Sequence, residues 1–201
     1  MRGTIIVVAA TLMTMASNAN AKVCTYGVSA GDVRVEWTAF KTTAKAPVKG
    51  TFNQMTLAGP TSAHSLKELA KGLSITIDGA SVESNNPGRN VTLSQFFFQK
   101  FAPTSAIKAS VVSLEGDDTK GTLNIAVTLN GVSKTLPFAY TVEAGVLQAK
   151  ATLSMRAFAL KAAFKSLHNA CASLHTGSDG VSKTWDDVEL ALSSKFTKTC
   201  K

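Results

Sequence analysis

"GTLNIAVTLNGVSKTLPFAYTVEAGVLQAKATL", residues 121–153, alternates apolar and polar side chains over three successive runs. This period of two predicts half-buried β-strands. Asn130-Gly131 between the first two runs is typical of a tight hairpin turn, and Glu143-Ala144-Gly145 turns the chain again. The in-phase residues of these two runs are Leu123, Ile125, Val127, Leu129, Leu136, Phe138, Tyr140 and Val142. The stretch therefore predicts consecutive antiparallel strands that share one apolar face.

The same pattern recurs on both sides of this stretch. The predicted strands are residues 32–40, 48–57, 73–78, 106–114, 121–129, 135–142, 146–155 and 188–196. Helices are predicted at 61–71 and 158–174, and residues 90–98 could form another short one. About eight antiparallel strands in one small chain favour an all-β fold, either a closed barrel or a sandwich, because closure removes exposed strand edges. An eight-stranded barrel with an apolar interior is wide enough for one elongated, lipid-like ligand.

The first 21 residues have the features of a signal peptide. Arg2 supplies a positive start, residues 4–15 are mostly apolar, and Ala19-Asn20-Ala21 fits a signal peptidase site. We therefore expect Lys22 to begin the mature chain, with a single domain over residues 22–201 and a periplasmic or secreted location. The apolar run is too short to span a bilayer and no later run is long enough, so no stable membrane insertion is expected.

The chain of 201 residues carries a formal net charge of +8, and its lysines and arginines are scattered along the sequence. Such a surface is attracted to anionic membranes or polymers by non-specific electrostatics. We expect no nucleic-acid partner, because the chain has neither a basic helix nor a basic stripe with stacking aromatic residues.

Five stretches, in order and spacing, resemble the YceI-like family of bacterial exported proteins, over roughly residues 30–197. They are "VRVEWTAFKTTAKAPVKGTFNQM" (33–55), "LSITIDGASVESNNPGRNVTLSQFFFQKF" (73–101), "LNGVSKTLPFAY" (129–140), "LSMRAFAL" (153–160) and "KTWDDVELAL" (183–192). The sequence departs from the family pattern at Asn90, Thr92 and Ala157, where an acid, a histidine and an aspartate are frequent.

The resemblance implies a lipocalin-like, eight-stranded antiparallel barrel with one or two short helices and an elongated apolar cavity. It also implies a polyisoprenoid, quinone-like or fatty-acyl ligand, no cofactor, and a possible homodimer. The residues predicted to line the cavity are Trp37, Phe52, Ile75, Ile77, Phe96, Phe97, Ile107, Ile125, Val127, Phe138, Tyr140, Leu153 and Met155.

The polar loop before the phenylalanines is predicted to form the rim that meets a ligand head group. Its candidate residues are Asn86, Arg89 and Asn90, and Arg89 is the only charge in "NNPGRN". The alternative is that Phe96, Phe97, Phe98 and Phe101 are ordinary core residues fixed by this loop. Pockets that combine an apolar lining with a few polar groups favour the ligand-binding interpretation.

No catalytic residues are predicted, because the sequence has neither a G-x-S-x-G elbow nor a glycine-rich phosphate loop. His168, Cys171 and His175 are candidate zinc or copper ligands, since a continuous helix would place them on one face. An alternative function is therefore a metal-handling protein or an enzyme that uses this helix. A third is a barrel without ligand that acts as a secreted interaction or stress protein.

The three cysteines predict one disulfide and one free thiol. In a closed barrel, the start of the first strand lies beside the end of the last. Cys24 and Cys200 occupy these positions, so we predict a bond between them that ties the two strands together. The rival pairing is Cys24 with Cys171.

Overall fold

The computed structural model describes residues 23–102 and 104–201. The predicted signal peptide lies outside them, so cleavage before Lys22 stays a prediction. The strands are β1 (Cys24–Lys41), β2 (Ala46–Phe52), β3 (Met55–Ala58), β4 (Ser62–Ala63), β5 (Ser74–Asp78), β6 (Val82–Glu83), β7 (Ala106–Gly116), β8 (Lys120–Leu129), β9 (Val132–Glu143), β10 (Val146–Ser154) and β11 (Thr184–Cys200). The helices are α1 (Leu66–Lys71), α2 (Pro87–Phe96) and α3 (Lys161–Ala170), with short 3-10 helices η1 (Gly79–Ser81), η2 (Phe98–Lys100), η3 (Met155–Phe158) and η4 (Ser173–His175). None of the helices described here is long and apolar enough to cross a bilayer.

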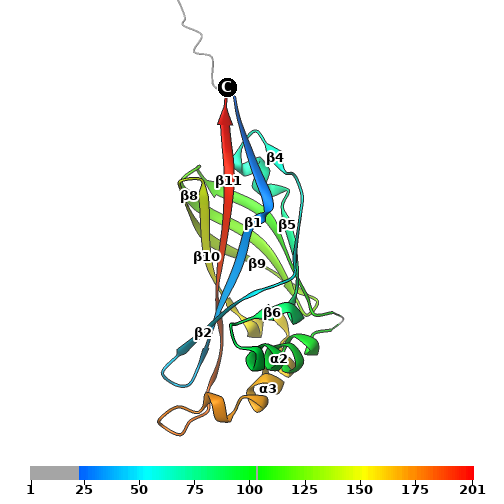
Figure 1. The fold of residues 1–201 in the computed structure, drawn as a ribbon, viewed down its shortest axis with the longest axis vertical. Helices are drawn as coiled ribbons and strands as arrows, with labels where there is room; N and C mark the ends of the chain where they lie inside the picture. The colour runs from blue at the N-terminus through cyan, green and yellow to red at the C-terminus, as the bar shows by residue number, and fades with distance from the viewer. Residues whose placement is uncertain (1–22, 103) are drawn as a thin grey trace, which may run out of the picture.

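The strands form one strongly curled antiparallel sheet, which confirms the all-β, lipocalin-like architecture (Figure 1). Hydrogen-bonded neighbours follow the order β3-β5-β7-β8-β9-β10-β11-β1-β2-β6, and β4 pairs with β1. The ladder of the described residues thus begins at β3 and ends at β6, so strand pairing does not close it all the way round. α1 packs against β7 on one side and against β4 and β1 on the other.

The predicted strand over residues 48–57 is divided at Asn53 and Gln54 into β2 and β3, which lie near opposite ends of the ladder. The Asn53 N–H donates to the Ser81 carbonyl oxygen (2.9 Å), and the Gln54 N–H donates to Ser81 Oγ (3.0 Å). These two amides therefore leave the sheet ladder. β2 pairs with β1, whereas β3 pairs with β5, and the bend between them carries the chain from one edge of the sheet to the other.

Two helices begin where side chains cap them. Ser65 accepts a hydrogen bond from the Glu68 N–H, so α1 starts later than the predicted residue 61. Residues 62–63 form β4 and pair with β1 instead. Asn86 accepts from the Arg89 N–H (2.9 Å), with Pro87 in the first helical turn. α2 therefore starts earlier than the predicted residue 90, because asparagine and proline are a strong helix-start combination.

The predicted helix over residues 158–174 is three shorter pieces, η3, α3 and η4. Ala159 has a left-handed backbone (φ 54°) that separates η3 from α3. α3 ends at Ala170, before the loop that leads to β11. The candidate metal ligands therefore do not share one continuous helix.

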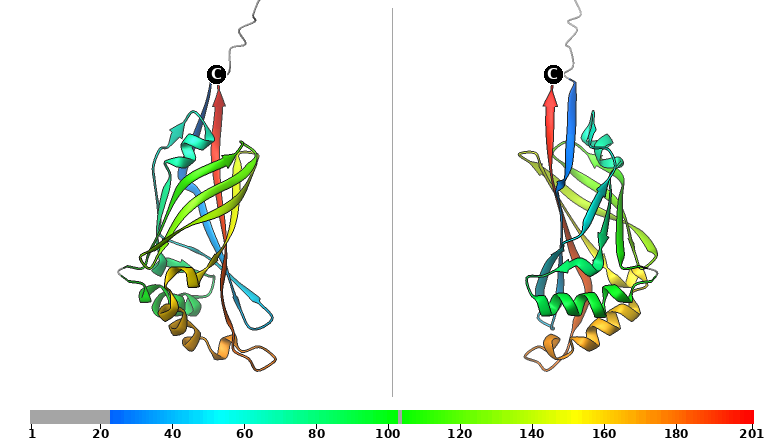
Figure 2. Two further views of the ribbon diagram at one scale, coloured as in Figure 1. Left: turned by 180° about the vertical axis from the view of Figure 1, so that it is seen from behind. Right: turned by 45° about the vertical axis from the view of Figure 1, so that its right-hand side comes forward.

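The molecule has two distinct ends along the β1–β11 ribbon. α2 and α3 pack against each other at one end of the curled sheet, and Cys24 and Cys200 lie at the other (Figures 1 and 2). β1 and β11 pair antiparallel from Cys24↔Cys200 to Lys41↔Thr184, with a register shift between Val28 and Val33. This ribbon connects the helical end to the end that holds both termini of the described chain.

Candidate ligand-binding cavity

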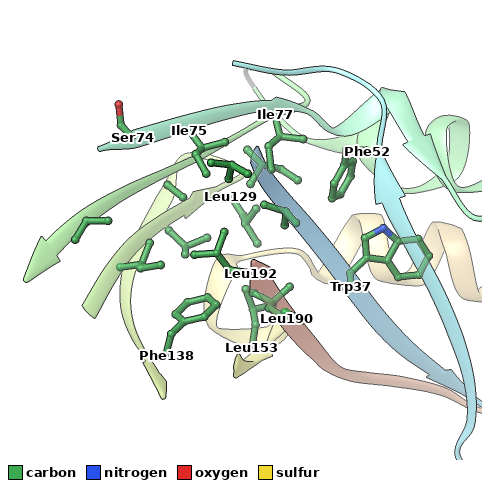
Figure 3. Close-up of a pocket in the computed structure, with 18 of the residues that line it drawn as sticks. Trp37, Phe52, Ser74, Ile75, Ile77, Leu129, Phe138, Leu153, Leu190 and Leu192 are labelled. Atoms are coloured by element: carbon green, nitrogen blue, oxygen red, sulfur yellow. The ribbon is translucent and has the colours of Figure 1, made fainter. Parts of the chain in front are cut away.

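A cavity of about 240 Å³ lies inside the curled sheet, between the helical end and the disulfide end (Figure 3). Apolar side chains from the strands form most of its lining, and the helices and the short segments beside them contribute the rest. Among the described residues, Ser74 and Ser194 are the polar side chains of the lining, and no charged side chain belongs to it. Burying a charge without a partner is costly, so this interior fits a hydrocarbon chain and excludes an ionic group.

Eleven of the thirteen residues predicted for the cavity lie in its lining. They are Trp37, Phe52, Ile75, Ile77, Phe97, Ile107, Ile125, Val127, Phe138, Leu153 and Met155. Figure 3 shows how Trp37, Phe52, Ile75, Phe138 and Leu153 project inward from different strands. Nine of the eleven come from strands, because side chains two positions apart along a strand share a face.

Three phenylalanines after the polar loop form a buried cluster at the helical end. Phe97, Phe98 and Phe101 are each less than a tenth exposed, and their ring centres lie 5.0–5.6 Å apart. Phe52 of β2 meets Phe98 edge to face at 5.7 Å. All four side chains also line the cavity, so the cluster is both core and lining. Such aromatic pairs stabilise a packed core beyond their buried area.

Phe96 and Tyr140 lie outside the lining, contrary to the prediction. Phe96 is 39% exposed at the end of α2, because successive helical residues point about 100° apart and cannot all face the cavity. Tyr140 is buried, but its hydroxyl donates to the Asp117 carbonyl oxygen (2.6 Å) near the β7–β8 turn. Burial, with Asp117 and Asp118 nearby, raises the pKa of Tyr140.

The polar loop caps α2 and forms hydrogen bonds with the segment that follows β6. None of its three predicted rim residues belongs to the cavity lining. Asn86 is the helix cap described above. Asn90 Oδ1 accepts hydrogen bonds from the Ser84 N–H (2.9 Å) and the Ser84 hydroxyl (2.6 Å). Arg89 lies in the first turn of α2, partly buried, and its Nε atom has no hydrogen-bond partner among residues 23–102 and 104–201. A glycine and proline turn next to asparagines can signal a helix start as well as a ligand rim, so the rim role of these residues stays a prediction.

The cavity also contains residues that were not predicted as site residues. β11 contributes Val188, Leu190, Ala191, Leu192, Ser194 and Phe196, which alternate along the strand except for Ala191. This alternation lies within the predicted strand 188–196, so the signal was present in the sequence. Leu66 and Leu69 of α1 enter the lining only because this helix packs between β7 and β1, which no local pattern indicates.

The predicted disulfide is present. Cys24 and Cys200 face each other in the β1–β11 ladder, and their sulfur atoms are bonded, which excludes the rival pairing with Cys171. Cys171 is a free, buried thiol whose pKa is raised by that burial.

The candidate metal ligands do not form a metal site. Within the described part of the chain, no three His, Cys, Asp or Glu side chains converge as metal ligands would. The Nδ1 atoms of His168 and His175 instead lie 2.9 Å and 2.7 Å from the Thr184 hydroxyl. Burial lowers the pKa of His175, and the positive charges of Lys41 and His168 add to this effect.

Comparison with known proteins gives the same family as the resemblance. A sequence model described as the YceI-like domain matches residues 26–196. A solved polyisoprenoid-binding domain from Saccharophagus degradans is 15% identical and has a TM-score of 0.61, over 87% of this chain and 98% of that one. Burkholderia cenocepacia BcnA is 14% identical with a TM-score of 0.55, over 85% and 99%. A Campylobacter jejuni YceI protein is 22% identical with a TM-score of 0.50, over 78% and 86%. No curated protein matches the sequence significantly.

Proposed function

Because the chain belongs to the YceI-like domain family, we propose that it is a binding protein, not an enzyme, and that it carries an isoprenoid or similar amphiphile. The hydrocarbon chain of the ligand occupies the cavity inside the curled sheet. The polyisoprenoid binding named for the Saccharophagus degradans domain supports this assignment, since the two proteins share the fold.

The observation that carries the proposal is the composition of the cavity lining, which has two serines and otherwise apolar side chains. Each methylene transferred from water into such an interior contributes about 0.8 kcal/mol, so affinity grows with the length of chain buried. Among the residues that the structure describes, the cavity lining offers no counter-charge for an ionic head group. The ligand therefore keeps any charged group outside and buries its chain, which suits quinone-like and fatty-acyl ligands as well as isoprenoids.

The location we propose is the periplasm or the exterior of the cell. Disulfides form and persist in oxidising compartments, and the Cys24–Cys200 bond is consistent with such a compartment. The signal-like first 21 residues add to this argument. A homodimer, which the family resemblance suggests, stays part of the proposal.

A cavity-blocking substitution tests the function. Ala109 lies in the lining between Ile75 and Val127, so Ala109→Trp fills the space that the ligand needs. Ala139→Trp on the exposed face of β9 is the matched control. Isothermal titration calorimetry with geranylgeraniol should show binding by the unmodified protein and the control but not by Ala109→Trp. Equal binding by a folded Ala109→Trp protein would overturn the proposal.

A further inference from the structure

The helical end of the molecule finishes in a compact projection, here named the distal tip and consisting of residues 41–45 and 173–183. These segments come from the β1–β2 turn and from the chain that leads into β11, and they lie opposite the disulfide end (Figures 1 and 2). The Thr42 N–H donates to the Lys183 carbonyl oxygen (2.9 Å), and the Lys41 ammonium donates to the Leu174 carbonyl oxygen (3.3 Å). Hydrogen bonds therefore hold the two segments together, and their exposed groups keep fixed relative positions.

The distal tip exposes large apolar side chains to solvent. Leu174 is 69% exposed, more than any other large hydrophobic residue that the structure describes, and Val181 is 49% exposed. Isolated exposed apolar residues are common on protein surfaces. Here two of them belong to one short segment at the extreme end of an elongated molecule.

The distal tip also carries lysines. Lys41, Lys45 and Lys183 belong to the distal tip, and Asp179 is its single carboxylate. Asp179 is already engaged, since it accepts hydrogen bonds from the Thr43 hydroxyl (2.6 Å) and the Val181 N–H (3.0 Å). The distal tip is therefore net positive.

An aromatic ring lies between two of these ammonium groups. The Nζ atoms of Lys45 and Lys183 lie 4.8 Å and 4.9 Å from the centre of the Trp185 ring, in cation–π contact. The indole N–H of Trp185 donates to the Thr42 carbonyl oxygen (2.8 Å). Tryptophan, lysine and exposed aliphatic side chains together suit the boundary between lipid head groups and acyl chains.

We propose that the distal tip is a docking surface for an anionic lipid membrane. Leu174 and Val181 enter the boundary between head groups and acyl chains, and the lysines contact lipid phosphates. The neighbouring helix α3 also carries two exposed lysines, Lys161 and Lys165, while its Leu167 lines the cavity. Docking thus sets the helical end of the cavity against the bilayer from which an amphiphile is taken. This role goes beyond the proposed binding function.

Vesicle co-sedimentation of the purified protein tests the proposal. We expect binding to vesicles of phosphatidylcholine with phosphatidylglycerol, weaker binding to phosphatidylcholine alone, and loss of binding at high salt. Lys45→Gln combined with Lys183→Gln should weaken the partition coefficient about tenfold or more, since each lysine near an anionic surface contributes substantially. Leu174→Ser combined with Val181→Ser should weaken it by about tenfold through lost apolar burial.

Matched controls come from other faces of the molecule. Val112→Ser replaces a residue of β7 that is 49% exposed, the same fraction as Val181. Lys150→Gln combined with Lys195→Gln removes two exposed lysines from β10 and β11. These variants should keep vesicle binding. In a Trp37→Phe background, lipids with brominated acyl chains should quench the fluorescence of Trp185. A thermal melt establishes that each variant is folded.

Three results would overturn the docking surface: no binding to anionic vesicles, equal losses in the control variants, or an unquenched Trp185. Self-association that the distal-tip variants abolish, without vesicle binding, would assign the surface to a second copy of the chain instead. A protein that docks on vesicles but binds no geranylgeraniol would overturn the cavity proposal and leave the docking surface in place.

Discussion

Gly50 lies directly against the Trp37 indole across the β1–β2 ladder. A Cβ atom at position 50 would lie 2.3 Å from Trp37 Cζ2 and 2.4 Å from the Glu83 carbonyl oxygen. The glycine therefore leaves the space that the indole occupies. Because Trp37 lines the cavity, this contact links the register of two strands to the shape of the binding site.

Gly50→Ala should displace Trp37 and destabilise the protein. Overpacking of a filled core commonly costs about 1–3 kcal/mol, and the free energy of unfolding in urea measures it. Gly88→Ala is the control, because the nearest atom to its new Cβ is Asn86 Oδ1 at 3.6 Å, and alanine favours the helix there. A fully stable Gly50→Ala protein with unchanged Trp37 fluorescence would contradict this packing.

Phe97→Ala should greatly weaken ligand binding, whereas Phe96→Ala should not. Phe97 lines the cavity, and its neighbour Phe96 is directed away from it. Truncation of a buried phenylalanine costs about 3–5 kcal/mol in stability, so circular dichroism must first establish that Phe97→Ala is folded. Geranylgeraniol titration then compares the two variants. Equal affinities would mean that the aromatic cluster is only structural.

Loss of the disulfide should lower stability without abolishing the cavity. The bond joins residues 176 positions apart, and the chain-entropy account credits such a loop with about 4–5 kcal/mol as an upper figure. The paired double variant Cys24→Ser with Cys200→Ser should show this loss in urea unfolding, and Cys171→Ala should show much less. An unchanged free energy of unfolding in the double variant would indicate that the bond adds little to the β1–β11 ladder.

His175 should make the protein less stable as the pH falls. Burial lowers the pKa of the folded ring below its ordinary value of 6.5, so the unfolded chain takes up the proton first. The free energy of unfolding therefore decreases as the pH drops through 6.5, and this loss levels off once the folded ring is itself protonated. His175→Gln should flatten the difference between unfolding at about pH 8 and at about pH 5. An unchanged pH dependence in His175→Gln would contradict this role.

The strand positions were predictable because each predicted strand has its own period of two. Val127, Ile125 and Leu153 could be assigned to the apolar face from the sequence. The alternation of apolar and polar side chains along a strand does not depend on which strand pairs with it. The cysteine pairing followed from strand order alone, because Cys24 and Cys200 flank the first and last strands.

Other features depend on contacts between distant parts of the chain. The bend at Asn53 exists because its amide bonds to Ser81, which lies 28 residues later. The position of α1 over the interior requires β7 and β1 to be in place. The polar loop is a different case, since Asn86 and Asn90 make local capping and turn hydrogen bonds, and their role at a ligand rim stays a prediction.

Organic extraction of the purified protein shows whether the cavity holds an isoprenoid or similar amphiphile. Mass spectrometry of the extract should identify a prenyl or acyl species in near-stoichiometric amount, and Ala109→Trp, purified in parallel, should lack it. An extract without lipid, together with no uptake of added geranylgeraniol by the unmodified protein, would contradict the account.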